Sequence, residues 1–318
     1  MAKTRVLITG ATGFIGRNMV EHFAARDDLL VTAIYHIRPM FECAGVAWLH
    51  ADLTNAAEVE RCVADADVII HAAATTSGSK DILSQPQIHI TDNAVMNSLI
   101  LRAAFEHQIR HLIFFSCLIM YPPKDGPLRE DDFTGDNIGD AYFGAAWTKI
   151  YIEKMCEFFA RSGKTKFTVV RHSNIYGPHD KFDLERSHVF GATVTKVLSA
   201  SDGKITVWGS GEEGRDLLYV DDLVSFVEAA IERQTEPFGL YNVGSGEAVP
   251  IRDLVAKIIA ASGRDLEVVH DLSKPTIPTN VSLDCSRAGD QLGWFAQTPL
   301  DEGIIRTIDW WRKNIGGG

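Results

Sequence analysis

Residues 6–16 read Val-Leu-Ile-Thr-Gly-Ala-Thr-Gly-Phe-Ile-Gly, and this segment is the clearest indication of the fold. An apolar run typical of a buried strand leads into three glycines, and a helical pattern follows them. Glycines at this spacing permit a tight turn and a close backbone approach to a diphosphate, whose charge is stabilised by the free amides and the dipole of the helix start. The stretch therefore predicts a dinucleotide-binding unit. We expect cofactor contacts from Gly10, Thr12, Gly13, Phe14, Ile15 and Gly16.

Outward from this unit, short apolar runs alternate with helical patterns through the first half of the chain, which is typical of βαβ units that build a parallel sheet. The predicted fold class is α/β, a Rossmann-type doubly wound parallel sheet with a smaller C-terminal α+β substrate lobe. We expect strands at residues 5–9, 30–35, 47–49, 68–71, 111–116 and 167–171, and helices at residues 16–25, 57–64, 93–106 and 141–161.

The second half of the chain has a different rhythm. Residues 176–213 read as loop-rich, one further strand-helix unit follows, and Gly and Pro punctuate the rest. We therefore expect residues 1–175 to form the nucleotide-binding domain, with residues 214–240 returning to it. Residues 176–213 and 241–318 should form the lobe that covers the switch-point crevice, where doubly wound sheets bind ligands.

The composition excludes several other classes of protein. The 318 residues are 46% hydrophobic, which is enough for one large or two moderate cores. A net charge of −11 argues against a nucleic-acid partner, because binding to the phosphate backbone depends on Lys and Arg. No apolar run approaches the roughly 20 residues of a membrane-spanning helix, so no membrane partner is expected. Five cysteines without a CxxC pair indicate neither disulfides nor a metal site, and favour the cytoplasm: Cys43, Cys62, Cys117, Cys156 and Cys285.

The end of the second predicted strand distinguishes between the two nicotinamide cofactors. An acidic residue there binds the ribose 2′-hydroxyl of NAD and repels the 2′-phosphate of NADP. This chain has His36 and Arg38 instead, which favours NADP by charge complementarity and leaves NAD as the alternative. Further candidates for cofactor contact are Asp52 and Leu53 at the adenine, and the small residues Ala72, Ala73 and Ala74 at the next strand end.

Two later stretches carry a resemblance that spans nearly the whole chain. Residues 174–189 read Asn-Ile-Tyr-Gly-Pro-His-Asp-Lys-Phe-Asp-Leu-Glu-Arg-Ser-His-Val, and Trp208-Gly-Ser-Gly is followed by Arg215. With the glycine-rich turn, these motifs resemble the extended short-chain dehydrogenase/reductases of the nucleotide-sugar epimerase/dehydratase family. Within that family, the chain is most similar to members that epimerise and reduce a GDP-linked 4-keto-6-deoxyhexose. The resemblance implies a nucleotide-sugar substrate and a nicotinamide cofactor.

The resemblance also exposes a gap in the catalytic machinery. The family uses a Tyr-xxx-Lys pair, because residues four apart share a helix face and an ammonium can lower the phenol pKa from about 10. Lys149 fits the lysine, but Ala145 stands four residues earlier. Tyr142 lies on roughly the same face, with its axial offset raised from about 6 to about 10 Å, so rescue by Tyr142 is strained. We favour an engineered replacement of the tyrosine over natural loss; in both cases the reduction should be severely impaired.

The strand end that supplies the family's hydroxyl group is also irregular. Counting back four residues from Tyr121 puts Cys117 at the position of the family's Ser or Thr, whereas aligning the Ser116-Cys117 pair puts it at the epimerisation cysteine. The resemblance implies that Cys117 and His188 move protons at the carbons that flank the 4-keto group. The catalytic candidates are Ser116, Cys117, Lys149 and His188.

Substrate contacts also follow from the resemblance. Arg215 matches an arginine that grips the sugar-nucleotide diphosphate, a task that suits the fixed fork of donors in a guanidinium. Lys196 and Trp208 match two further substrate contacts. The family places the nicotinamide carboxamide, mainly through backbone groups, at the strand end formed by His172, Ser173, Asn174 and Ile175. The substrate candidates are Asn174, His188, Lys196, Trp208 and Arg215.

Two other functions remain open at this point. One is an NAD-dependent nucleotide-sugar epimerase that holds its cofactor tightly. The other is a non-catalytic, cofactor-sensing member of the fold, which the missing phenol favours and the retained Lys149, His188 and Arg215 oppose. The family commonly pairs through the helices that begin near Asn93 and Ala141, so we also expect a homodimer.

Overall fold

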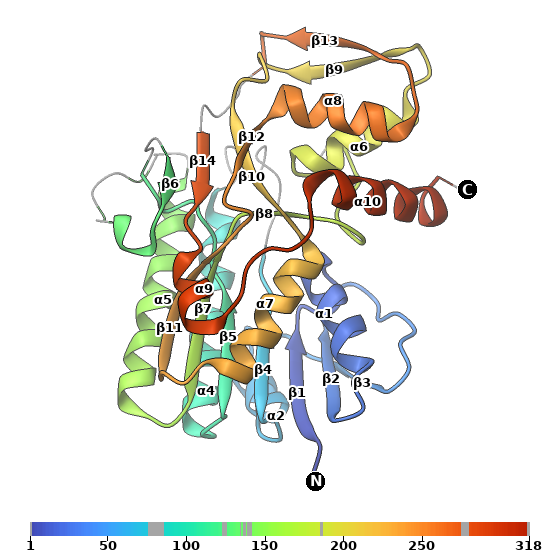
Figure 1. Ribbon diagram of the computed structural model, residues 1–318. Helices are drawn as coiled ribbons and strands as arrows, with labels where there is room; N and C mark the ends of the chain where they lie inside the picture. Colours follow the sequence, from blue (N-terminus) through green and yellow to red (C-terminus); the bar gives the residue numbers. More distant parts are fainter. Residues whose placement is uncertain are drawn as a thin grey trace.

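A seven-stranded parallel sheet organises the larger part of the molecule (Figure 1). The computed structural model describes residues 2–75, 86–122, 126–133, 135, 138, 142–184, 187–274 and 280–316. The strand order is β11-β7-β5-β4-β1-β2-β3. It reverses direction beside β1, as in doubly wound sheets, which bind ligands at the carboxyl ends of the strands there. The bounds are β1 Thr4–Thr9, β2 Leu29–Tyr35, β3 Val46–His50, β4 Val68–His71, β5 His111–Phe115, β7 Lys166–His172 and β11 Phe238–Val243.

Helices cover both faces of this sheet and bury a separate hydrophobic cluster on each. Successive strand residues point to opposite faces, so Val6 and Ile8 lie in one cluster and Leu7 lies in the other. Burial on both faces explains why the strands read as continuous apolar runs. The first face carries α1 Phe14–Ala24 and α7 Val220–Arg233, and the second carries α2 Ala56–Val63, α4 Thr91–Glu106 and α5 Phe143–Ser162.

A smaller lobe lies beyond the carboxyl ends of the main sheet, at the top of Figure 1. One of its sheets has the order β12-β10-β14-β6, with β8 paired to β10, and a second pairs β13 with β9. A third hydrophobic cluster joins α6, α8 and α10 to these strands. The strand bounds are β6 Pro127–Leu128, β8 Asn174–Tyr176, β9 Lys204–Trp208, β10 Gly214–Tyr219, β12 Ala248–Pro250, β13 Glu267–Asp271 and β14 Asn280–Leu283. The helices are α6 Val189–Ser199, α8 Ile251–Ser262, α9 Ser286–Leu292 and α10 Leu300–Asn314, with short 3-10 turns η1 Pro86–His89 and η2 Glu130–Asp132.

The expected fold class is confirmed, as are the six strands and four helices expected from the first half; position 141, the expected start of the last helix, lies outside the described residues. The prediction that residues 176–213 are loop-rich missed two regular elements, α6 and β9. The helix was hidden because Gly191 and several β-branched residues lower its intrinsic propensity. Tertiary packing overrides that propensity: Phe190, Val194 and Val197 are buried in the third cluster, and a Cβ at Gly191 would lie 2.4 Å from the carbonyl oxygen of Lys181.

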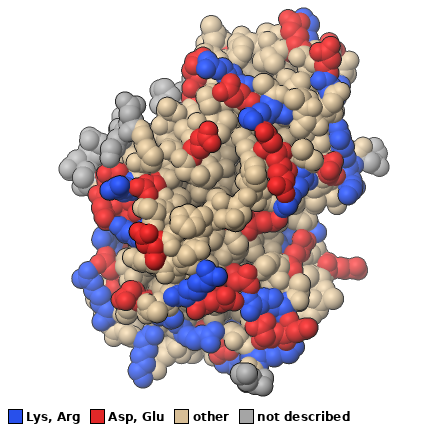
Figure 2. All heavy atoms as spheres, in the orientation of Figure 1, with Lys and Arg blue, Asp and Glu red and all other residues tan. Residues whose placement is uncertain are grey.

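The segment 214–240, expected to return to the larger domain, is divided between the two parts. β10 pairs within the smaller sheet, whereas α7 packs on the main sheet and β11 extends that sheet to Val243. The face shown in Figure 2 carries Lys and Arg interspersed with Asp and Glu around an uncharged centre. Among the described residues, no helix is both long and apolar enough to cross a bilayer.

Candidate functional site

The turn between β1 and α1 is shaped by its glycines. Gly10 has a φ of +63°, and a Cβ there would lie 2.6 Å from backbone atoms of Ala72 and Ala73. A Cβ at Gly16 would lie 2.1 Å from the carbonyl oxygen of Gly10. The turn thus needs glycine at Gly10 for a left-handed backbone conformation and at Gly16 for close packing of the helix against the turn. Ala72 and Ala73, which follow β4, lie against this turn, and their contact with a cofactor stays a prediction.

The first turn of α1 offers backbone donors to an anion. Gly13 is the N-cap and supplies no side-chain acceptor, and no acidic residue stands in the first turn. The amides of Phe14, Ile15 and Gly16 have no acceptor within the helix, because the first amides of any α-helix lack one. These amides lie at the positive end of the α1 dipole, and the glycines of the turn leave space beside them. Such an arrangement fits the diphosphate of a dinucleotide.

The adenosine side of this site is exposed at the end of β2. His36 and Arg38 are both exposed, and no acidic side chain of the described residues pairs with Arg38. Asp52 accepts hydrogen bonds from the backbone amide and the hydroxyl of Thr54, at 2.9 and 2.7 Å. Leu53 is 6% exposed and packs in the second hydrophobic cluster, so only its backbone remains available to a ligand.

Lys149 reaches from α5 to the carboxyl end of β5. Its Nζ donates a 2.6 Å hydrogen bond to the carbonyl oxygen of Phe115 and lies 4.9 Å from the ring centre of Phe114. Burial lowers the pKa of Lys149, and the neighbouring Cys117 and Glu153 partly oppose that shift. Burial raises the pKa of the Cys117 thiol, and the Lys149 ammonium acts in the opposite direction. The predicted lysine and cysteine therefore lie together at one strand end.

Ser116 is oriented away from this pair, into the protein. It is 1% exposed, and its hydroxyl donates a 2.5 Å hydrogen bond to Glu153. Glu153 also forms a buried ion pair with Arg171, with 2.6 Å between Nη2 and Oε2. The structure thus gives the Ser116 hydroxyl a place in a buried network beneath the site, and its catalytic role stays a prediction.

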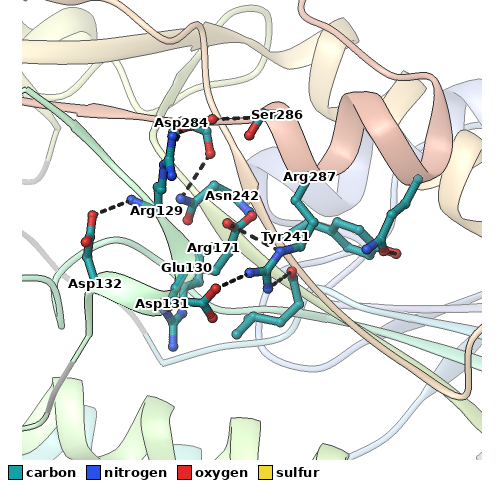
Figure 3. A network of polar contacts seen from close by, with 12 residues as sticks. Arg129, Glu130, Asp131, Asp132, Arg171, Tyr241, Asn242, Asp284, Ser286 and Arg287 are labelled. Atoms are coloured by element: carbon teal, nitrogen blue, oxygen red, sulfur yellow. Dashed lines mark hydrogen bonds and ion pairs between the residues drawn. The ribbon is translucent and has the colours of Figure 1, made fainter.

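The same network holds the segment between β5 and α5, as Figure 3 shows. Arg171 donates a 3.0 Å hydrogen bond to the carbonyl oxygen of Glu130 in η2, and the Glu130 carboxylate accepts one of 2.8 Å from the backbone amide of Asn242 in β11. Arg287 of α9 pairs with Glu130 and donates a 2.7 Å hydrogen bond to Asp131. These contacts anchor η2, which follows Cys117 in the chain, to β7, β11 and α9.

His172 lies near Lys149, and His188 lies near His172. His172, at the end of β7, donates from Nδ1 to the carbonyl oxygen of Ser173 at 2.7 Å. Burial lowers the pKa of His172 to about 4, with smaller contributions from Lys149 and His188. Desolvation by the surrounding protein also lowers the pKa of His188, the N-cap of α6, and Lys181 adds to that shift, although His188 keeps an exposed surface. Both imidazoles are therefore neutral near pH 7, and a pKa of about 4 makes His172 the weak base of a site that must move protons.

Tyr142 enters the site from the start of α5. It is half-buried, and Cys117 and Arg215 are close enough to influence the pKa of its phenol. Burial raises the pKa of its phenol, and the Arg215 guanidinium acts in the opposite direction. Ala145, about one turn further along the helix, offers no group that can exchange a proton. The structure thus brings a phenol to the region from a position outside the Tyr-xxx-Lys spacing.

The expected substrate contacts of the smaller lobe are partly assembled. Lys196 donates to the carbonyl oxygen of Thr206 at 2.8 Å, and its ammonium lies 5.8 Å from the ring centre of Trp208. Lys274, which the sequence analysis missed, lies at the same distance from that half-exposed ring. Asn174 donates its side-chain amide to the carbonyl oxygen of Asp216 at 3.0 Å. Ser173 and Ile175 are buried, so their side chains are not presented at the surface.

A doubly wound sheet with a glycine-rich turn, and a lysine facing a neighbouring strand end, define an NAD(P)-dependent enzyme of the short-chain dehydrogenase/reductase type. Residues 6–244 match the NAD dependent epimerase/dehydratase family, and the chain belongs to this family.

Relatives and solved structures agree with that assignment. GDP-L-fucose synthase of Escherichia coli (strain K12) is 30% identical over 329 residues, covering 99% of this chain and 98% of that protein. GDP-L-colitose synthase of Yersinia pseudotuberculosis is 28% identical over 315 residues, covering 96% and 97%. The structure of UDP-glucose 4-epimerase from Thermotoga maritima with UDP-glucose aligns with a TM-score of 0.87 at 24% identity, covering 98% of this chain and 100% of that one.

Proposed function

We propose that the protein binds NADP(H) and acts on a GDP-linked 4-keto-6-deoxyhexose, with proton transfer at C3 and C5 and hydride transfer at C4. The observation that carries this proposal is the closeness of Cys117 and Lys149 at the carboxyl end of β5, with His172 at the end of β7 near Lys149 and His188 of the smaller lobe near His172. When bound, the reduced dinucleotide supplies the hydride. NADP is supported by the exposed His36 and Arg38 and by the absence of an acid at the end of β2.

Proton transfer beside a ketone needs a base, an acid and a positive charge near the oxygen. His188 is neutral near pH 7 because burial lowers its pKa, so it can remove a proton. Cys117 is protonated because burial raises its pKa, so it can return one. The Lys149 ammonium, held by the carbonyl oxygen of Phe115, would stabilise the negative charge that develops between these steps.

The smaller lobe would bind the rest of the substrate. We assign the diphosphate to Arg215 and Lys196, and the base to the exposed Trp208 ring, which two ammonium groups flank. All five cysteines are free thiols, which fits a reducing cytoplasm.

We further propose a homodimer that pairs through α4 and α5. Large apolar side chains are exposed at spacings of four and seven residues along α5, and Val95 of α4 is 40% exposed. Such a stripe on a helix favours an interface. The α5 residues are Phe143 at 59%, Trp147 at 40%, Tyr151 at 58% and Phe158 at 62%.

The central experiment restores the missing phenol. In Ala145→Tyr we expect NADPH oxidation with a GDP-4-keto-6-deoxyhexose to rise by roughly a hundredfold or more over the unaltered protein, the usual contribution of a general acid. Ala145→Phe is the matched control, because it adds the ring without the hydroxyl. The unaltered protein should still exchange the C3 and C5 hydrogens for deuterium in D2O. Negligible turnover in Ala145→Tyr, together with no exchange in the unaltered protein, would reject the proposal.

An NAD-dependent epimerase is the second candidate, favoured by the structural likeness to UDP-glucose 4-epimerase. A third candidate is a non-catalytic cofactor sensor, which Ala145 favours because alanine cannot exchange a proton. A sensor would not need Arg215, which we assign to the diphosphate of the sugar nucleotide. Mass spectrometry of copurifying molecules separates the three. Tightly bound NAD supports the epimerase, a dinucleotide without any sugar nucleotide supports the sensor, and NADP with a GDP-sugar supports our assignment.

A further inference from the structure

Two histidines lie side by side at the carboxyl ends of β2 and β3. His36 follows β2 directly, and His50 is the last residue of β3. Their ring centres are 5.8 Å apart, and the His50 ring also lies 5.3 Å from that of Tyr35, its register partner in β2. Both histidines are exposed, and neither imidazole has a hydrogen-bond partner among the described residues. Two open imidazoles therefore face the same region of the surface.

Backbone hydrogen bonds connect this pair to the glycine-rich turn. The amide of Ala11 in the turn donates to the carbonyl oxygen of Ile34 in β2 at 3.2 Å, and the amide of Ala51 after β3 donates to that of Tyr35 at 3.1 Å. The ends of β1, β2 and β3 therefore form one continuous edge. In dinucleotide-binding sheets, the end of the second strand contacts the adenosine ribose, where NADP carries its 2′-phosphate. The histidine pair lies at that strand end.

We propose that His36 and His50 both bind the 2′-phosphate of NADP(H), and that their protonation makes the choice between NADPH and NADH depend on pH. The inference rests on the proposed NADP(H) function, to which it adds a residue of β3 and a control by pH. Histidine is the side chain whose charge ordinarily changes between pH 5 and 8. An imidazolium donates a charge-assisted hydrogen bond to a phosphate oxygen, whereas a neutral imidazole contributes no charge. Acidification through this range therefore strengthens binding of the phosphorylated dinucleotide.

The charged neighbours of the pair in the chain do not titrate in this range. Arg38, two residues after His36, is exposed and always charged, so it supplies a preference for NADPH that pH does not change. Asp52 follows β3, and hydrogen bonds from Thr54 lower the pKa of its carboxyl, with smaller contributions from His36 and His50. Asp52 therefore stays ionised, which favours the protonated histidines and leaves their titration as the variable.

The other elements packed against this edge contribute charges of both signs. Arg61 of α2 donates a 3.3 Å hydrogen bond to the carbonyl oxygen of His50. It also lies 3.9 Å from Glu58 of the same helix, whose carboxylate accepts a 2.9 Å hydrogen bond from the backbone amide of Asp52. The loop between β2 and β3 adds Glu42, which is exposed and lines a separate cavity beside Trp48. Carboxylates and guanidinium groups keep their charges between pH 6.5 and 8.5, so only the histidines change theirs.

The ratio of the NADH and NADPH dissociation constants isolates this effect, and fluorescence titration measures both. The two dinucleotides differ only in the 2′-phosphate, so titrating groups elsewhere in the site cancel in the ratio. From pH 8.5 to pH 6.5 we expect the ratio to rise about tenfold in the unaltered protein, roughly threefold from each histidine. The 2′-phosphate loses charge only near and below its own pKa of about 6, and that loss opposes the rise.

Glutamine variants assign the rise to its residues. His36→Gln and His50→Gln should each reduce it to about threefold, and the double variant should have a ratio that does not change with pH. His107→Gln is the matched control, because His107 is an exposed imidazole that pairs with Glu60 at the end of α4, and it should retain the full rise. Arg38→Ser should lower the ratio by the same factor at both pH values.

NADH binding confirms that each variant is folded, since it should equal that of the unaltered protein. A double variant whose ratio still rises as in the unaltered protein would overturn the pH-dependent contact while leaving the proposed function intact. A full rise in His50→Gln would overturn the role of the β3 residue. Failure of the unaltered protein to bind NADPH at either pH would overturn both the inference and the proposed function.

Discussion

Replacing Glu153 by glutamine tests whether the buried network beneath the site holds this part of the fold. The side chains of Glu153 and Arg171 are each 4% exposed, and the carboxylate accepts hydrogen bonds from Arg171 at 2.6, 3.1 and 3.2 Å and from Ser116 at 2.5 Å. Removing one charge of such a pair leaves the other buried and uncompensated, which typically costs about 3–5 kcal/mol. Glutamine keeps one oxygen acceptor, so we expect a loss near the lower end of that range.

Urea unfolding near pH 7 measures this loss as a decrease in the free energy of unfolding. Glu157→Gln is the matched control on the same helix: its partners Lys154 and Arg161 are exposed, so it should cost at most about 1 kcal/mol. Glu153 also raises the pKa of Lys149. In the pH profile of Glu153→Gln, the decrease in activity that follows deprotonation of Lys149 should therefore occur at a lower pH than in the unaltered protein. An unfolding free energy within about 1 kcal/mol of the unaltered protein would refute the reasoning, because the pair would then contribute no more than a surface contact.

Four further outcomes are expected. Gly10→Ala should abolish measurable NADPH binding in a fluorescence titration and cost at least about 1–2 kcal/mol of stability, because its φ of +63° and the 2.6 Å contacts of a Cβ are both unfavourable. Arg38→Ser should weaken NADPH binding by about tenfold or more while leaving NADH binding unchanged, and equal losses for the two would contradict a 2′-phosphate contact. Tyr151→Arg should convert the dimer to a monomer in size-exclusion chromatography with light scattering, whereas an unchanged mass would place the interface elsewhere. Burial lowers the pKa of His71 to about 4, so the unfolded chain binds a proton below about pH 6.5 that the folded chain excludes. His71 should therefore contribute about 1.4 kcal/mol per pH unit to the loss of stability between there and pH 4, and in urea unfolding at a series of pH values His71→Gln should reduce the slope by about that amount.

The regular part of the fold could be predicted because its signals are local. The apolar runs of the main sheet and the glycine-rich turn lie within short windows, and the structure has strands and a turn at those positions. The helix α6 escaped prediction because its stability comes from contacts of Phe190 and Val194 with distant segments, which no local window contains. His50 gave no local signal either, because only the parallel register of β2 and β3 brings it beside His36.

The class of sheet, the place of the diphosphate turn and the family can be inferred from the sequence, because periodicity, glycine spacing and motif identity are properties of neighbouring residues. The arrangement of the functional groups depends on how distant segments pack. Packing turns Ser116 inward to Glu153, places Cys117 beside Lys149, and brings the phenol of Tyr142 to the same region. It also brings α10 beside the start of α1, and it leaves Oδ2 of Asp180 without a hydrogen-bond partner among the described residues. Burial and the distances between charges set pKa values and hydrogen-bond partners, and both arise only when segments far apart in the chain pack together.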